Sequence, residues 1–403
     1  MSDFDEYIRQ GEPQEKERGY AWQTAVGLQA VDGLKPSEYL IATARQHIEG
    51  DITIDEVRQL IKSYYESKEN RVANTDDTEE ADKVSANIAK LLNERTFAFT
   101  VAGFTAVHRH IFDGVFKFAG KIRDYNITKQ EWVLNGDTVL YVSAPDIRKA
   151  IEYDIEQEKA FDYTELSMRQ ITGHITQFVS GLWQIHPFAE GNTRTTAVFT
   201  IQYLRSMGFD VENDLFAGHS WYFRNALVRA NYQNVQKGIK RNPEYLERFF
   251  RNLLMKEKNE LRNRYLLIQT PEEFKEVEKQ AENRTSTEQP TEQLTEQPTE
   301  QLTEQLTEQP TEQLTEQPTE QPTEQLTEQL TEQEQLLLSV MGNEHFTLKM
   351  LMEKVGLKHR PTFLANYINP AIKDGLVKVL YPEKPNHPRQ KYLLTVKGTA
   401  MRN

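Results

Sequence analysis

The chain has 403 residues, of which 38% are hydrophobic, and its formal net charge is −13. It contains no cysteine, which excludes disulfides, thiol catalysis and cysteine-ligated zinc. Twelve glutamates and no basic residue lie between residues 287 and 333, which leaves only −1 for the rest of the chain. The N-terminus is acidic and has no apolar segment typical of a signal peptide, and no run reaches the ~18 apolar residues of a spanning helix. We therefore expect a cytoplasmic protein with no membrane partner.

The first 67 residues predict an N-terminal extension followed by two helices. Residues 1–35 are mixed in character, with scattered apolar residues. A helix is expected from Pro36 to Glu49, because proline is favoured at a helix start and Gly50 is a natural C-terminal stop. Thr53 or Asp55 caps the second helix, which continues the apolar spacing.

The middle of the chain is predominantly helical in pattern. Residues 67–82 are polar and charged, and we expect a linker there. Apolar residues at helical spacing predict helices at residues 84–92, 105–118, 146–160, 164–185, 196–207, 220–231 and 244–266. His108 and His110 lie two positions apart, so on a helix they point in different directions and cannot bind one metal together.

One β-hairpin is expected within this helical region. Residues 125–128 and 139–142 are rich in β-formers, and Asn135-Gly136 between them is a tight-turn dipeptide. An ordinary surface hairpin is the simplest interpretation.

The most informative segment is His-Pro-Phe-Ala-Glu-Gly-Asn-Thr-Arg-Thr-Thr-Ala at residues 186–197. The proline after His186 cannot extend the preceding helix. A glycine turn at Gly191, where the next helix starts, aims backbone N–H groups at one point, and Arg194 adds positive charge to this anion site. With His186 as a base and Glu190 as a ligand for a hard divalent ion, the segment suits phosphoryl or nucleotidyl transfer.

This order of residues resembles the signature of the Fic family, His-x-Phe-x-Asp/Glu-Gly-Asn-Gly-Arg-x-x-Arg. Six of its eight specified positions agree at fixed spacing. Thr193 replaces the second glycine of the signature, and Ala197 replaces the second arginine, which normally meets the γ-phosphate of ATP. Segments 107–112 and 118–123 also resemble the Fic core. The resemblance implies an all-α bundle with a β-hairpin flap, which transfers AMP from ATP to a Ser, Thr or Tyr hydroxyl of a target protein.

The resemblance also implies roles for individual residues. His186 is the catalytic base, and Glu190 holds Mg²⁺. The residues expected to contact ATP are Gly191, Asn192, Thr193, Arg194 and, through the adenine, Tyr222. An aromatic residue on a helix is also often part of the core. The flap residues expected to pair with the target are Ile127, Thr128 and Lys129.

The helix pair at 36–67 resembles the small antitoxins that inhibit Fic enzymes, whose pattern is Ser/Thr-x-x-x-Glu-Gly/Asn. Glu49-Gly50 matches the end of that pattern, whereas Arg45 stands where Ser or Thr is expected. The resemblance implies that Glu49 inhibits the enzyme. The alternative is a plain helix end in which Arg45 and Glu49 form an i,i+4 pair.

The C-terminal part divides into a linker and a small domain. Residues 285–333 are dominated by a Thr-Glu-Gln-Leu/Pro repeat, whose prolines and unpaired glutamates predict disorder. Residues 334–403 carry helices followed by two strands, at 376–380 and 390–395, which is the winged-helix layout. Eleven Lys and Arg against five Asp and Glu give this domain a net charge of +6, which suits either DNA or a protein partner.

The sequence thus predicts a mainly α protein in five parts. These are an extension at 1–35, antitoxin-like helices at 36–67, a Fic core at 68–284, a linker at 285–333 and a winged helix at 334–403. The expected function is protein adenylylation. The alternatives are a DNA-binding regulator with a non-catalytic Fic core, and a Fic transferase that uses another donor such as UTP.

Overall fold

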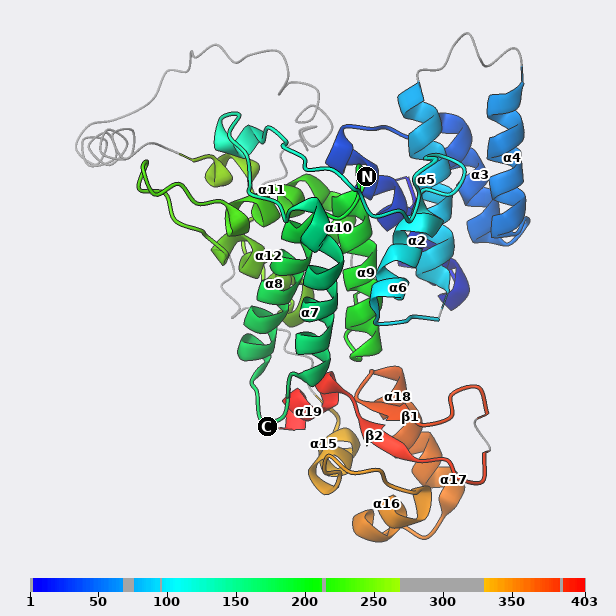
Figure 1. Cartoon of the computed structure of the whole chain (residues 1–403). Coiled ribbons are helices and arrows are strands. Elements are labelled where there is room, and N and C mark those ends of the chain that lie inside the picture. The colour runs from blue at the N-terminus through cyan, green and yellow to red at the C-terminus, as the bar shows by residue number, and fades with distance from the viewer. Residues whose placement is uncertain are drawn as a thin grey trace, which may run out of the picture. The chain divides into compact units, whose positions relative to one another are not determined.

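The computed structural model describes residues 3–67, 76–94, 96–211, 215–268, 330–384 and 387–402 (Figure 1). The predicted linker at 285–333 lies almost wholly outside these residues. The described chain is mainly helical, as the sequence predicted.

Helices account for nearly all of the regular structure before residue 268. The N-terminal elements are α1 (Asp5–Gln10), α2 (Pro13–Gly27), the 3-10 helix η1 (Leu28–Asp32), α3 (Glu38–Glu49), α4 (Ile54–Glu66) and α5 (Asp76–Asn93). They are followed by α6 (Val101–Ile111), η3 (Trp132–Leu134), η4 (Ala144–Asp146), α7 (Ile147–Ala160), α8 (Met168–Ile185) and α9 (Asn192–Ser206). The last elements before residue 268 are α10 (Leu215–Gly218), α11 (Ser220–Asn231), α12 (Glu244–Met255) and η5 (Asn263–Leu266).

The capping residues explain why α3 and α4 begin and end where they do. The Ser37 hydroxyl accepts a hydrogen bond from the Leu40 amide, so Ser37 is the N-cap and α3 begins one residue later. Gly50 ends this helix in the left-handed region with φ of 89°. Thr53 caps α4 in a reciprocal pair with Glu56. Both helices were predicted from these signals and are confirmed.

The polar stretch 67–82 is not wholly a linker, since α5 already includes residues 76–82. The reason is a buried carboxylate that the composition does not reveal. Asp82 is fully buried and accepts hydrogen bonds from the Ser37 amide, the Ser37 hydroxyl and the Tyr65 hydroxyl. These bonds satisfy the carboxylate and fix the start of α5 against α3 and α4. Residues 68–75 lie outside the described part of the chain.

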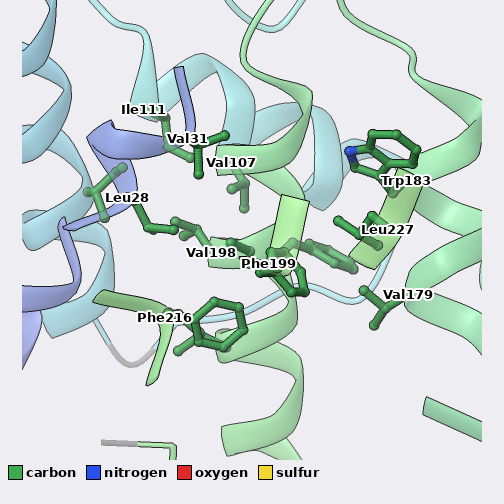
Figure 2. Packing of buried hydrophobic residues seen from close by; sticks show 14 of the residues in the cluster. Leu28, Val31, Val107, Ile111, Val179, Trp183, Val198, Phe199, Phe216 and Leu227 are labelled. Carbon is green, nitrogen blue, oxygen red and sulfur yellow. The ribbon is translucent and has the colours of Figure 1, made fainter. Parts of the chain in front are cut away.

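The N-terminal extension belongs to the same hydrophobic core as the central helices. Trp22 and Leu28 are completely buried, and Val31 is nearly so. Figure 2 shows Leu28 and Val31 of η1 among side chains of α6 and α9, such as Val107 and Val198. Residues 1–35 are therefore an integral part of the helical domain, not an appendage to it.

Helix α8 is central to the packing of this domain. It contacts α7, α9, α11 and α12 (Figure 1). Its buried residues follow the helical spacing seen in the sequence, including Ile175, Val179 and Leu182. Helix α9 follows after a short loop and is buried along almost its whole length. Residues 186–191 thus form the loop between two core helices, and residues 192–197 form the first turns of α9.

The predicted hairpin at 125–142 is wrong in its strands and correct in its turn. Asn135 and Gly136 both have positive φ, 52° and 85°, and the Glu131 amide donates to the Asp137 carbonyl. No strand is assigned between residues 125 and 142. The backbone carbonyls of Tyr125 and Val142 accept hydrogen bonds from the buried guanidinium of Arg123 instead of pairing in a ladder.

The C-terminal region has its own buried cluster, which includes Leu337, Leu351, Phe363 and Ile368. Its elements are α15 (Glu332–Val340), α16 (Leu348–Val355), α17 (Arg360–Phe363), the π-helix η6 (Leu364–Ile368), α18 (Asn369–Lys373), β1 (Val377–Val379), β2 (Tyr392–Leu394) and α19 (Val396–Arg402). The two strands pair antiparallel, with Lys378 opposite Leu393. This order agrees with the predicted helices and strands, while the winged-helix assignment stays a prediction.

Candidate active site

His186 follows the last residue of α8 in an unusual backbone conformation. Its φ and ψ are 50° and 59°, in the left-handed region, which ends the helix and turns the chain into the loop. The residue is only 4% exposed, and neither ring nitrogen has a hydrogen-bond partner. The ring packs against Tyr141 and Trp183, with centroid distances of 4.2 and 5.2 Å. A buried imidazole with two unused nitrogens is available to exchange a proton with a substrate that reaches it.

The surroundings of His186 keep its imidazole neutral. Burial is the main cause of a pKa well below the ordinary value of 6.5, and the positive charges of Lys129, Arg224 and Arg123 lower it further. The neutral ring is the form that can accept a proton. His186 is therefore in its proton-accepting form at neutral pH.

The loop after His186 is held by its own side chains. The Asn192 amide group accepts from the Phe188 N–H at 2.9 Å and donates to the Phe188 carbonyl at 2.8 Å. The Thr193 hydroxyl accepts from the Trp183 indole at 2.9 Å. The side chains of Asn192 and Thr193 thus shape the loop, and their backbone amides are the groups left for a ligand.

Gly191 allows the loop to enter α9 tightly. Its φ is 76°, in the left-handed region. A Cβ at this position would lie only 2.1 Å from a carbon of the Phe112 ring. Any other residue would therefore displace the ring or the loop. The first-turn N–H groups of α9 have no intrahelical acceptors, and the anion site expected there stays a prediction.

His108 supports the same loop from α6. Its Nδ1 accepts from the Gly120 amide at 2.8 Å, and its Nε2 lies 3.1 Å from the Glu190 carbonyl oxygen. Its ring stacks on Phe188 at a centroid distance of 3.8 Å. The sequence correctly favoured a packed histidine over a metal ligand. The sequence did not reveal the contact between the His108 ring and the Glu190 carbonyl, because the two residues lie 82 positions apart in the chain.

Arg194 is buried, and its charge is paired inside the protein. It is 2% exposed, and its guanidinium is paired with Asp32 at 2.9 Å and with Glu80 at 2.7 Å. Gln29 accepts a further hydrogen bond at 3.0 Å, and Phe112 covers one face of the group at 4.9 Å. Two carboxylates therefore already neutralise the arginine that the sequence assigned to ATP.

Glu190 lies on the exposed side of the loop. Its side chain is 53% exposed, and its carboxylate accepts from the Lys129 ammonium at 2.8 Å. The predicted metal ligand and one of the predicted flap residues are thus joined directly. An exposed single carboxylate beside a phosphate site fits Mg²⁺, which proteins bind through one or two carboxylates together with substrate phosphates.

Comparison with known proteins supports this interpretation of the loop. Residues 98–204 match the Fic/DOC family profile, and this range includes the whole of the His186 loop. The chain contains a Fic domain. Residues 332–395 match a second profile, that of the C-terminal domain of Fic-like proteins (filamentation induced by cAMP).

A relative of the Fic domain is the protein adenylyltransferase VbhT of Bartonella schoenbuchensis, which is 30% identical over 108 residues. That match covers 27% of this chain and about a fifth (21%) of the relative. Among solved structures, a Fic family protein from Desulfovibrio desulfuricans G20 is 16% identical, with 98% of this chain and 94% of that chain covered, at a TM-score of 0.40. BepC from Bartonella tribocorum, solved with bound AMPPNP, is 17% identical, with 45% and 90% covered, at a TM-score of 0.34.

The predicted adenine contact, Tyr222, is buried, whereas the predicted target-binding residues Ile127 and Thr128 lie nearer the surface. Tyr222 is buried, and its hydroxyl donates to the Tyr245 carbonyl at 3.1 Å, which favours a core role over contact with adenine. Ile127 is partly exposed and Thr128 exposed, both on the loop that replaces the predicted hairpin. They directly precede Lys129, whose ammonium donates to Glu190 of the motif.

Glu49 is not brought to the Fic motif. Its carboxylate accepts a hydrogen bond from the Tyr7 hydroxyl, and the carboxylates at Arg194 come from Asp32 and Glu80. The inhibitory role that the resemblance implies for Glu49 is therefore not supported by these contacts and stays a prediction. No acidic or histidine cluster suited to a metal occurs in the described part of the chain, nor does any of its helices have the length and apolarity to cross a bilayer.

Proposed function

We propose that this protein transfers AMP from ATP to a hydroxyl group of a target protein. The observation that carries the proposal is His186, a buried neutral imidazole with two unpartnered nitrogens, placed at the end of α8 and at the start of the short loop that leads into α9. A base beside an anion site is the arrangement that hydroxyl attack on a phosphate requires. The relative VbhT is a protein adenylyltransferase, which supports the same reaction.

In the proposed reaction a Ser, Thr or Tyr hydroxyl of the target reaches His186 from the side of the 125–142 loop. The hydroxyl proton moves to His186 while its oxygen forms a bond to the α-phosphorus of ATP. The bond from that phosphorus to the oxygen bridging to the β-phosphate breaks, and pyrophosphate leaves. The amides of the first turn of α9 stabilise the negative charge that develops on the phosphate oxygens.

Glu190 is the residue we propose to hold Mg²⁺. A bound Mg²⁺ neutralises phosphate charge and helps to orient the leaving group. Glu190 must then release Lys129, its present partner, or share its two oxygens between the cations.

The direct test is incubation with α-labelled ATP and a host-cell lysate. Wild-type protein should label at least one lysate protein, and His186→Ala should not, while both unfold at the same temperature. Parallel incubations with labelled UTP, GTP and CTP determine the donor, which Ala197 leaves open. Wild-type labelling that persists in His186→Ala would overturn the mechanism, and no labelling with any nucleotide would favour a non-catalytic Fic core.

The charge of +6 on residues 334–403 supports a second proposal, DNA contact by this domain. The full chain should then bind duplex DNA with an affinity that falls steeply as salt concentration rises. Lack of binding at low salt would favour a protein partner.

A further inference from the structure

The Fic motif of this chain supplies less positive charge than its chemistry needs. Ala197 carries no charge, and the guanidinium of Arg194 is occupied by Asp32 and Glu80 inside the protein. A nucleoside triphosphate carries several negative charges, and phosphoryl-group enzymes oppose them with Lys, Arg and metal ions. Another cation should therefore face the donor.

Among the described residues, three cations lie close enough to lower the pKa of His186: Lys129, Arg224 and Arg123. Arg123 is buried and donates to the carbonyls of His186, Tyr125, Val142 and Ile185. It is a structural group that fixes the loop and cannot turn toward a substrate without breaking these bonds. Its role is to position the backbone on both sides of the site.

Arg224 is also engaged. Its guanidinium lies 2.7 Å from a carboxylate oxygen of Glu131, whose side chain is completely buried. Removing Arg224 from this pair would leave a buried carboxylate without its counter-ion, which is costly. Arg224 is therefore held where it is.

Lys129 differs from both arginines. Its side chain is 27% exposed, and its ammonium donates to Glu190, which is itself exposed and on the motif loop. Glu190 directly precedes Gly191, the residue that caps the N-terminus of α9. The ammonium thus stands beside the anion site, and an ammonium has three N–H donors, of which Glu190 uses one.

We propose that Lys129 binds the β and γ phosphates of the donor nucleotide and so supplies the charge that Arg194 and Ala197 do not. This inference rests on the proposed function. In the free protein Glu190 holds the ammonium at the edge of the site. When donor and Mg²⁺ bind, Glu190 turns to the metal and Lys129 to the phosphates. The Lys129–Glu190 pair is thereby replaced by two contacts, one between Glu190 and the metal and one between Lys129 and the phosphates, and no cation is left unpaired.

The proposal separates Lys129 from the target-binding role expected of the 125–142 loop. A residue that meets the β and γ phosphates should discriminate ATP from AMP, which lacks them. A residue that meets the target should affect the KM of the target and leave nucleotide affinity unchanged. A plain surface ion pair should affect neither.

The test is calorimetric titration of the full chain with ATP and with AMP, both in the presence of Mg²⁺. The variants are Lys129→Met, which removes the charge, and Lys129→Arg, which keeps it. The matched control is Lys159→Met, since Lys159 forms an exposed ion pair with Glu156 on α7. Thermal unfolding should show that all three variants fold as the wild type does, because neither lysine is buried.

We expect Lys129→Met to raise the Kd for ATP about tenfold, which is typical for loss of one charge-assisted contact, and to change the Kd for AMP less than about twofold. Lys129→Arg should stay close to wild type, as should Lys159→Met. Equal ATP affinity in wild type and Lys129→Met would overturn the inference and leave the proposed function standing. A wild-type protein that binds neither nucleotide and labels no target would instead overturn the proposed function, and this inference with it.

Discussion

His108 and His186 are both buried in the Fic domain, but the structure gives them different tasks. The ring nitrogens of His108 contact Gly120 and the Glu190 carbonyl, whereas those of His186 have no partner. His108 thus holds the loop in place and His186 is left for chemistry. The local sequence identified His186 because the motif is contiguous. It could not identify the role of His108, because that role depends on a residue far along the chain.

The burial of His108 predicts a pH dependence of stability. Burial lowers the pKa of His108 from 6.5 to about 4 in the folded protein. The unfolded chain therefore takes up a proton at higher pH than the folded protein does. The stability contributed by neutral His108 is complete above about pH 6.5 and is lost as pH falls from there toward 4.

Urea unfolding at about pH 7 and pH 5 measures this loss. His108→Asn cannot be protonated and should show a smaller difference in the free energy of unfolding between the two pH values. Some difference should remain, because the pKa of His47 is also lowered by burial, to about 4. Identical pH dependence in wild type and His108→Asn would contradict this account.

The carboxylates at Arg194 predict a larger effect on stability. In Asp32→Asn/Glu80→Gln the buried guanidinium keeps its charge and loses both counter-ions. Breaking a buried pair costs roughly 3–5 kcal/mol, and the partial exposure of these carboxylates reduces the expected loss to about 2 kcal/mol. Thermal and urea unfolding would measure it.

Glu49→Gln is the matched control for that pair of substitutions, because Glu49 is exposed and bonds to Tyr7 only at the surface. It should change the free energy of unfolding by less than about 1 kcal/mol. If the double variant were as stable as this control, the ion pairs at Arg194 would not be significant for the fold.

At the scale of elements, the helices were predictable and the loop at 125–142 was not. Helix starts and stops depend on local signals, such as Ser37, Thr53 and Gly50, that act within one turn. The loop depends on Arg123, whose guanidinium donates to the carbonyls at both ends of the segment, Tyr125 and Val142, and to the carbonyl of His186. A β-rich composition cannot reveal that a side chain has taken the place of strand pairing.

Arg123→Met tests the role of this guanidinium. The variant leaves the carbonyls of Tyr125, Val142 and His186 without their donor, so hydrogen exchange should become faster across 125–142. Exchange in the middle of α8 should not change. Arg148→Met on α7 is the control, because Arg148 is exposed and on the surface. Equal exchange in 125–142 for both variants would show that Arg123 does not hold the loop.

At the scale of the molecule, the first 35 residues and the Fic domain share one hydrophobic core. Leu28 is fully buried in it, near α6 and α9. The sequence showed apolar residues in this region, but no motif revealed that they pack against helices far along the chain. Domain boundaries drawn from motifs therefore separated segments that the core joins.

Leu28→Ala should show this shared core directly. Removing a fully buried leucine costs about 2–5 kcal/mol through lost burial and the cavity left behind. The control Leu60→Ala removes a leucine that is 39% exposed and should cost less than about 1 kcal/mol. Urea unfolding followed by circular dichroism gives both values. Equal stability of the two variants would mean that the extension does not contribute to the domain core.

The central claim is that His186 acts as the base for transfer of AMP, and not of the γ-phosphoryl group of ATP, to a target hydroxyl. Two samples of ATP, one labelled at the α-phosphate and one at the γ-phosphate, distinguish these outcomes in a single experiment with wild-type protein and His186→Asn. We predict that the target acquires the α label, does not acquire the γ label, and acquires neither with His186→Asn. Transfer of the γ label, or α labelling that survives in His186→Asn, would contradict the account.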